Sequence, residues 1–363
     1  MAEAANKRRT ISLGGKFTKR LMAGPVAPAD VTVTTASLNR ILRYEPRDLT
    51  VSVEAGMPFA ELSRILARNG QMVPLDPPYA ESATVGGILG ANSSGSRRRL
   101  YGTARDMVIG LTYATLEGKL VQSGGMVVKN VAGLDMGKLM IGSFGTLAAI
   151  AVVNFKLSPK PAAERTSLLS FETLPLALAA RARILESVLQ PSAIDLLNPL
   201  ASAQIGYRGY VLAIQFGGAP DVVERYSREL SGGTELNGAE EQRFWGQVQN
   251  ASQRFTEKFA DGVVVRVSSA LKQVGDVFES LDVPVIARAA TGVSYAYFSR
   301  ADAAQKWMKA KPWRAVMEFS PESEKHRLDL WPSPGTDFAM MKKVKQLFDP
   351  GNLLNHGRLY RQI

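Results

Sequence analysis

The chain has 363 residues, 45% hydrophobic and 21% charged, which is the composition of an ordinary soluble protein long enough for two domains. It contains no cysteine, which excludes disulfides, iron–sulfur ligation and thiolate catalysis within the chain, and its two histidines, His326 and His356, make a histidine-rich metal site unexpected. The net charge of +11 is dispersed over short clusters without a nucleic-acid-binding motif, so we expect no nucleic-acid partner.

The N-terminus lacks the apolar core of a signal peptide, and with the missing cysteines this favours a cytoplasmic location. Residues 139–155 are nearly apolar enough for a membrane span, but they are short and contain Gly142, Gly145 and Asn154. We interpret them as a helix end, a glycine turn and a buried strand. No transmembrane segment is predicted, and any peripheral membrane association would come through partners.

The first half of the chain alternates between strand and helix patterns. A helix is predicted after Pro58 and ends at Gly70, and a hairpin turns at Glu117-Gly118 within residues 110–125. The other predicted strands cover residues 10–15, 31–35, 49–56, 72–75 and 146–159.

Residues 82–102, "SATVGGILGANSSGSRRRLYG", stand out because small residues dominate the first fifteen. Gly86, Gly87, Gly90 and Gly95 disfavour both a helix and a strand, so we expect a loop. Its bare backbone could approach a phosphate-bearing ligand closely, and a flexible surface loop is the alternative.

The glycine-rich character stops near residues 159–164, and residues 165–320 predict a separate α+β domain. Its strands are "TSLLSF", "YVLAIQF", "GVVVRVSSAL" and "WRAVMEF", and its helices lie near 175–189, 220–230, 240–256 and 300–309. A helix around 336–348 leads into the tail "FDPGNLLNHGRLY".

Common nucleotide and hydrolase motifs are absent from this sequence. Gly86, Gly87 and Gly90 do not form the Rossmann fingerprint, no acidic residue follows at the required distance, and no Walker A lysine is present. Ile141 stands where the G-x-S-x-G nucleophile elbow requires glycine, so a serine hydrolase is not expected.

Three separate segments carry the remaining glycines: "LGGKFTK" (13–19), "ATVGGILGANSSG" (83–95) and "KNVAGLDMGKLMIGSFGTLAAI" (129–150). In this order, and with "YEPRDLTVSVEAGMPFAELSRIL", "YGTARDMVIG" and the tail, they resemble the FAD-binding flavoproteins of the vanillyl-alcohol oxidase, PCMH-type family. The resemblance is strongest to the FAD-binding subunits of glycolate oxidase complexes.

The resemblance implies an α+β fold with three parts. Residues 1–160 would form the PCMH-type FAD-binding domain of two α+β subdomains, residues 161–325 an α+β cap domain, and residues 326–363 a tail that returns to the FAD domain. Compared with the family, the chain starts inside the first helix, so this domain is expected to be N-terminally truncated. In the segment "KNVAGLD", Leu134 stands where the family has an aromatic residue.

The resemblance also implies where FAD would bind, non-covalently because no histidine lies near an anchoring loop. One side of the FAD-binding site would be formed by Gly14, Gly15, Lys16 and Thr18. The diphosphate and its sugar would meet Thr84, Val85, Gly86, Gly87, Asn92, Ser93 and Gly95, followed by Tyr101, Gly102, Arg105 and Asp106, the last two as a structural ion pair. Gly145, Thr146 and Ile150 would lie along the adenosine half, and Asn355 and Arg358 at the flavin edge.

The implied function is that of the FAD-binding subunit of a glycolate oxidase (2-hydroxy-acid dehydrogenase) complex. Its partners would be a second FAD subunit and an iron–sulfur subunit, and its role would be assembly or electron transfer. A non-flavin scaffold and a self-sufficient dehydrogenase are the alternatives. His356 is the only candidate base. Arg266, Lys272 and Arg288 could bind a carboxylate, although solvated surface residues are the favoured interpretation.

Overall fold

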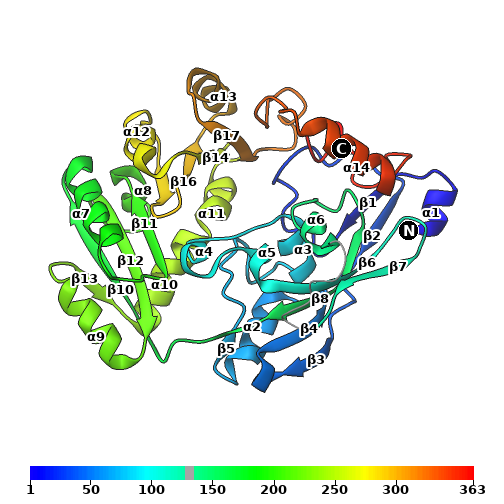
Figure 1. The fold of residues 1–363 in the computed structure, drawn as a ribbon. Helices are drawn as coiled ribbons and strands as arrows, with labels where there is room; N and C mark the ends of the chain where they lie inside the picture. The colour runs from blue at the N-terminus through cyan, green and yellow to red at the C-terminus, as the bar shows by residue number, and fades with distance from the viewer. Residues whose placement is uncertain (127–134) are drawn as a thin grey trace. The chain divides into compact units, whose positions relative to one another are not determined.

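The computed structural model describes residues 1–126 and 135–363 (Figure 1), so part of the third glycine-bearing segment, including Leu134, lies outside the described residues. The chain divides into two compact units. Unit 1 consists of Met1–Ser94, Gly102–Lys160 and Ser333–Ile363, and unit 2 of Gly95–Tyr101 and Pro161–Pro332.

The larger sheet of unit 1 has five antiparallel strands in the order β3-β4-β8-β6-β7. These are β3 (Ile41–Glu45), β4 (Thr50–Glu54), β6 (Val108–Ala114), β7 (Leu120–Gly124) and β8 (Ala149–Lys156). Every residue of β4 is buried, which its position between two strands explains. The β6–β7 pairing confirms the predicted hairpin.

Two smaller sheets complete the strands of unit 1. The parallel pair β1 (Ile11–Gly14) and β2 (Val31–Thr34) leads into the first glycine loop. The pair β5 (Gln71–Met72) and β9 (Ser158–Pro159) joins the end of the predicted helix to the end of the long strand.

The helices of unit 1 are short, apart from α2 and α14. They are α1 (Ala2–Asn6), α2 (Phe59–Ala67), α3 (Val85–Gly90), α5 (Ala104–Met107), α6 (Met136–Met140) and α14 (Phe338–Phe348), with a 3₁₀ turn η1 (Pro46–Asp48). Helix α6, a glycine turn and β8 follow one another as predicted for residues 139–155. Within the described ranges, no helix has the length and apolar character needed to cross a bilayer.

Helix α3 corrects the expectation of a loop in the glycine-rich stretch. The Thr84 hydroxyl accepts a hydrogen bond from the Gly87 N–H at 3.2 Å and so caps the helix. Val85, Ile88 and Leu89 are all buried. Capping and apolar burial therefore outweigh the low helix propensity of glycine.

Unit 2 contains one antiparallel sheet of eight strands in the order β13-β10-β12-β11-β15-β16-β14-β17. The strands are β10 (Ala163–Phe171), β11 (Ala193–Leu197), β12 (Tyr210–Gly218), β13 (Thr234–Leu236), β14 (Val263–Ser268), β15 (Val285–Arg288), β16 (Val293–Phe298) and β17 (Arg314–Phe319). Sequence analysis missed β11, β13, β15 and β16.

The two faces of this sheet differ. Alternate residues such as Leu196, Ile214 and Val265 enter one apolar core together with side chains of α7, α9, α12 and α13. The intervening positions on neighbouring strands carry buried polar groups, including Asp195 and Arg288. The helices of unit 2 are α4 (Arg98–Tyr101), α7 (Leu174–Glu186), α8 (Pro199–Ala203), α9 (Pro220–Glu229), α10 (Gly238–Gln249), α11 (Ala251–Lys258), α12 (Val274–Glu279) and α13 (Ala301–Ala310), with η2 (Leu271–Gln273). The mixture of helices and antiparallel sheets in both units confirms the predicted α+β class.

Candidate functional site

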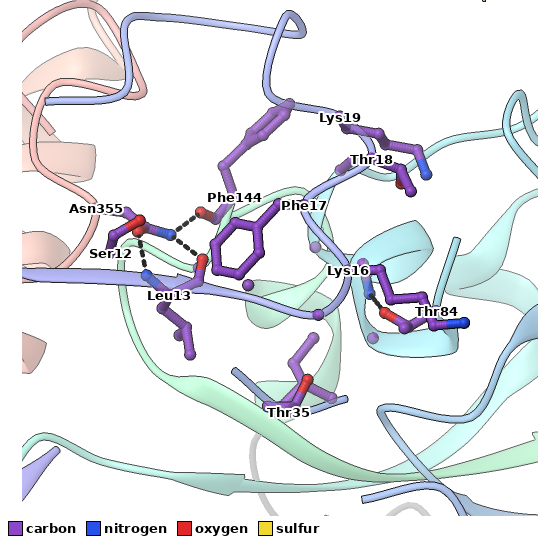
Figure 2. Close-up of a pocket in the computed structure, with 18 of the residues that line it drawn as sticks. Ser12, Leu13, Lys16, Phe17, Thr18, Lys19, Thr35, Thr84, Phe144 and Asn355 are labelled. Carbon is purple, nitrogen blue, oxygen red and sulfur yellow. Dashed lines mark hydrogen bonds between the residues drawn. The ribbon is translucent and has the colours of Figure 1, made fainter. Parts of the chain in front are cut away.

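A cleft in unit 1 encloses about 860 Å³ when its open mouth is included. Its walls come from the loop after β1, helix α3, the turn before β8, and the C-terminal tail. Figure 2 shows Asn355 at one end of the cleft, Thr84 at the other and the Phe17 ring between them. Segments from the beginning, middle and end of the chain therefore meet at one site.

The loop after β1 presents its backbone to this cleft. Within the described part of the chain, the backbone N–H groups of residues 15–19 meet no hydrogen-bond acceptor. Phe17 adopts a positive φ of 54°, a conformation that bulky residues rarely adopt, and its ring covers Gly14. Successive N–H donors in a loop of this kind form a concave site suited to an anion.

Glycine is required where this loop passes helix α3. A Cβ atom added to Gly15 would lie 2.1 Å from the Thr84 hydroxyl oxygen, well inside the contact limit. Any side chain at this position would push the loop away from the helix or break the Thr84 cap. The two glycine-bearing segments found in the sequence are therefore packed directly against each other.

Asn355 holds the other end of the cleft together. Its Oδ1 accepts a hydrogen bond from the Leu13 N–H at 2.7 Å, and its Nδ2 donates to Leu13 O at 3.0 Å and Phe144 O at 2.8 Å (Figure 2). Beside it, Gly145 has a φ of 69°, and an added Cβ would lie 2.8 Å from Asn355 Nδ2. The tail, β1 and the turn before β8 are thereby joined through one side-chain amide.

The cleft is electropositive. Its described lining contains four cationic side chains, Lys16, Lys19, Arg20 and Arg358, and no carboxylate. Arg358 is nearly buried, donates to Gly24 O at 2.8 Å, and its guanidinium carbon lies 5.6 Å from the centre of the Phe144 ring. Four cations beside a row of unsatisfied N–H groups are suited to a ligand with more than one negative charge.

Eleven of the twenty residues expected around FAD line this cleft: Gly14, Gly15, Lys16, Thr18, Thr84, Gly86, Gly87, Gly145, Ile150, Asn355 and Arg358. Nine do not: Val85, Asn92, Ser93, Gly95, Tyr101, Gly102, Arg105, Asp106 and Thr146. Gly95 and Tyr101 belong to the segment assigned to unit 2. Thr146 is buried and donates from its hydroxyl to Ser143 O at 2.8 Å.

Two of the expected roles need correction. The N–H groups of Gly86 and Gly87 are already bound, to Ala55 O and to the Thr84 hydroxyl, so the unsatisfied donors belong to residues 15–19 instead. Asp106 accepts hydrogen bonds from the N–H and hydroxyl of Thr103 at 2.8 and 3.0 Å. It therefore caps α5 rather than forming the expected ion pair with Arg105.

Sequence reasoning missed several cleft residues, of which Phe17, Lys19, Gly90 and Phe144 matter most. Phe17 and Lys19 stand inside the quoted segment "GGKFTK", but an aromatic ring and a lysine there gave no signal of facing a ligand. Gly90 follows the two glycines that were selected.

The candidate residues for substrate chemistry lie elsewhere or are engaged. His326 and His356 are exposed, and His356 Nδ1 lies 2.7 Å from Asn352 Nδ2. Arg266 forms an ion pair with Glu318 at 2.7 Å, Lys272 is exposed, and Arg288 is buried against Asp195, which corrects its assignment to the solvated surface. No group of three or more metal-ligating side chains occurs within the ranges that the structure covers.

Comparison with known families agrees with this geometry. Residues 1–124 match the FAD binding domain family, and residues 333–359 match the C-terminal domain of FAD linked oxidases. The two matches contain the first glycine loop, α3 and Asn355. Residues 1–124 are thus similar to an FAD binding domain, and FAD is the cofactor that the family matches and the FAD-linked relatives support for this chain.

Among individual proteins, the glycolate oxidase subunit GlcE of Escherichia coli is 28% identical over 99% of this chain and 95% of its own length. The glycolate oxidase subunit GlcD of Bacillus subtilis is 33% identical, but the match covers 44% of this chain and 34% of that protein. A mitochondrial D-lactate dehydrogenase of Saccharomyces cerevisiae is 30% identical over 44% of this chain and 27% of its own length. The fold resembles that of a solved alkyldihydroxyacetonephosphate synthase, with a TM-score of 0.73, 18% identity, and coverage of 97% of this chain and 72% of that one.

The residues present fit this cofactor. The FAD diphosphate carries two negative charges and would satisfy the N–H groups of residues 15–19, while the four cations balance its charge. When bound, the flavin accepts a hydride or electrons. The protein's own part at this site is to hold and orient that group.

Proposed function

We propose that this chain is the FAD-binding subunit of a glycolate oxidase complex that oxidises a 2-hydroxy acid. The unit 1 cleft, with its unsatisfied N–H groups, four cations and no described carboxylate, is the observation that carries the proposal. FAD is held non-covalently, because the described cleft lining contains no histidine or tyrosine that could bond to the flavin.

The subunit role rests on two further facts. The similarity to GlcE extends over 95% of that protein, so the comparison concerns a whole subunit. The chain has no cysteine to hold an iron–sulfur cluster, so electrons leaving the flavin pass to a cluster carried by a partner. We therefore propose a second FAD subunit and an iron–sulfur subunit as the partners. We also propose that the complex is cytoplasmic.

Substrate oxidation needs a base near the flavin, because the hydroxyl proton must leave as hydride is transferred. The described cleft lining offers no histidine, aspartate, glutamate or tyrosine for this task. We therefore expect the isolated chain not to oxidise glycolate or D-lactate. Dye reduction by glycolate, assayed with the purified chain and with the co-expressed complex, tests this; turnover by the isolated chain would favour the self-sufficient dehydrogenase.

FAD binding itself is tested by Gly90→Leu. Gly90 lines the cleft at the end of α3, and a Cβ atom added there has no described atom within 4 Å, so the leucine side chain starts in the open space of the cleft. We expect the purified variant to fold, to melt within a few degrees of the wild type and to retain less than a tenth of the FAD.

The matched control is Gly246→Leu, another helical glycine whose added Cβ meets nothing within 4 Å, but in α10 of unit 2. It should retain FAD as the wild type does. Bound flavin is measured from its visible spectrum after gel filtration, and acid should release it into solution. If the wild type itself retains no FAD, the chain acts as a scaffold and the flavoprotein proposal fails.

A further inference from the structure

Lys19 is a buried cation in the cleft. Its side chain is on the cleft lining, the residue is 9% exposed, and its Nζ has no hydrogen-bond partner among the described residues. Its Nζ lies 5.9 Å from the centre of the Tyr79 ring. A buried ammonium without a hydrogen-bond acceptor is costly, so such groups are normally found with an anionic partner.

Among the described residues, the cleft lining supplies no anionic partner for Lys19. The other charged groups on the cleft lining are Lys16, Arg20 and Arg358, all cationic. Arg358 even donates a hydrogen bond to the backbone carbonyl of Lys19, at 3.4 Å. Burial lowers the pKa of the Lys19 ammonium to about 8, and the described cleft lining contains no carboxylate that would oppose this shift.

Lys19 also belongs to the loop whose N–H groups are unsatisfied. Its own N–H and those of residues 15–18 lack acceptors within the described chain, so one anion could satisfy the amides and the ammonium together. A phosphate has several oxygens and accepts both kinds of hydrogen bond. Neither the glycine pattern nor the GlcE comparison assigns a role to this lysine.

The geometry points to Lys19 as the cationic ligand of the FAD diphosphate, donating from Nζ to a phosphate oxygen. This inference rests on the proposed function, because it needs FAD in the cleft. Lys19 would add a side-chain positive charge to a phosphate site whose other donors are the backbone N–H groups of the glycine loop. It also makes FAD binding depend on pH, since only the protonated amine donates to the phosphate and carries the charge.

The test compares FAD affinity of the wild type, Lys19→Met and Lys343→Met at pH 7, using quenching of flavin fluorescence. Methionine matches the lysine stem and removes the buried charge, so the variant should fold and its ligand-free form should melt at or above the wild-type temperature. Lys343 is an exposed lysine of the same unit and controls for net charge. We expect about a tenfold to hundredfold loss for Lys19→Met and no loss for Lys343→Met.

The pH dependence is the second measurement. A bound phosphate raises the pKa of Lys19, so binding takes up a proton above pH 8 and affinity falls as the pH rises. Between pH 7 and 9.5 the wild type should lose about tenfold in affinity, whereas Lys19→Met should change little over that range.

The outcomes separate the two proposals. If the wild type binds FAD and Lys19→Met binds it equally well, or with the same pH dependence, the Lys19 inference is wrong and the FAD site stands. A shift in the spectrum of bound flavin with unchanged affinity would place the ammonium at the ring and also overturn it. If the wild type binds no FAD, the proposed function fails, and the inference fails with it.

Discussion

Replacing Lys345 by methionine should lower the free energy of unfolding of unit 1 by about 3–5 kcal/mol. The Lys345 ammonium is buried and donates to the Asp349 carboxylate at 2.7 Å, to Thr146 O at 2.8 Å and to Leu354 O at 2.9 Å. Without it, the Asp349 charge stays buried and, among the described residues, keeps the N–H groups of Leu353 and Leu354 as its donors. An uncompensated buried charge is among the most destabilising changes a single substitution makes.

This substitution should also weaken FAD binding. Lys345 lies on α14 and donates to Thr146 O in the turn before β8 and to the carbonyl of the residue that precedes Asn355. These hydrogen bonds help to position Asn355, which bonds to Phe144 O at one end of the cleft. Burial lowers the pKa of Lys345, although the Asp349 carboxylate opposes the shift. The charged form of Lys345 is thus stabilised by the Asp349 carboxylate and not by solvent.

Urea unfolding measures the effect, with Lys343→Met as an exposed control on the same helix. Lys345→Met combined with Asp349→Asn removes both charges and keeps one side-chain oxygen, which can accept from the N–H group of Leu353 or of Leu354. We expect the pair to recover at least half of the lost stability. A loss below about 1 kcal/mol for Lys345→Met alone, equal to that of an exposed ion pair, would contradict this account.

The strands and long helices were predictable because their patterns are local. Residues 49–56 alternate with a period of two and form β4, and the turn at Glu117-Gly118 closes the β6–β7 hairpin. The glycine loops were predictable as part of a binding site because closely packed backbone requires glycine, as Gly15 against Thr84 shows. In each case the signal lies within a short stretch of sequence.

The buried charges were not predictable, because their environment is built from distant parts of the chain. Lys19, Lys345 and Arg288 each resemble an ordinary surface residue in the sequence, and Arg288 was interpreted as one. Lys345 meets Thr146, 199 residues away, and Arg288 meets Asp195, 93 residues away. Such pairs carry no local period, so only the fold brings them together.

The short strands of unit 2 were missed for a related reason. Asp195 interrupts the apolar run of β11, and Arg288 ends the run of β15. Each reads as a break in a strand pattern. In the structure the two residues lie directly opposite each other on paired strands, so each explains the other's burial.

Arg288→Met should lower the free energy of unfolding of unit 2 by about 3–5 kcal/mol. Asp195 is fully buried, and its carboxylate is bound by the Arg288 guanidinium and by the Ser96 hydroxyl, the latter at 2.7 Å. Arg288 also donates to the Ser96 hydroxyl at 2.9 Å, and its guanidinium carbon lies 5.3 Å from the centre of the Tyr295 ring. Methionine would remove the Arg288 guanidinium from this buried carboxylate.

The control is Arg314→Met, an exposed arginine on β17 of the same sheet, which should cost less than about 0.5 kcal/mol in urea unfolding. Arg288→Met with Asp195→Leu removes both charges and should recover most of the loss, because an apolar pair can replace a buried ion pair. If the double variant is no better than Arg288→Met, the ion pair does not explain the burial of Asp195.

A local readout comes from the segment that Ser96 joins to this pair. Residues 95–101 contain Arg97, Arg98 and Arg99, which are sites for trypsin. Within unit 2, Ser96 bonds to Asp195 and Arg97 to Glu164, which ties this segment to the rest of the unit. Losing Arg288 removes one donor to the Ser96 hydroxyl. It also removes a cation from the Asp195 carboxylate to which that hydroxyl donates. Limited trypsin digestion should therefore cut Arg288→Met within this segment several times faster than Arg314→Met. Equal cutting rates would mean that Glu164 and the rest of the segment hold it without the buried pair.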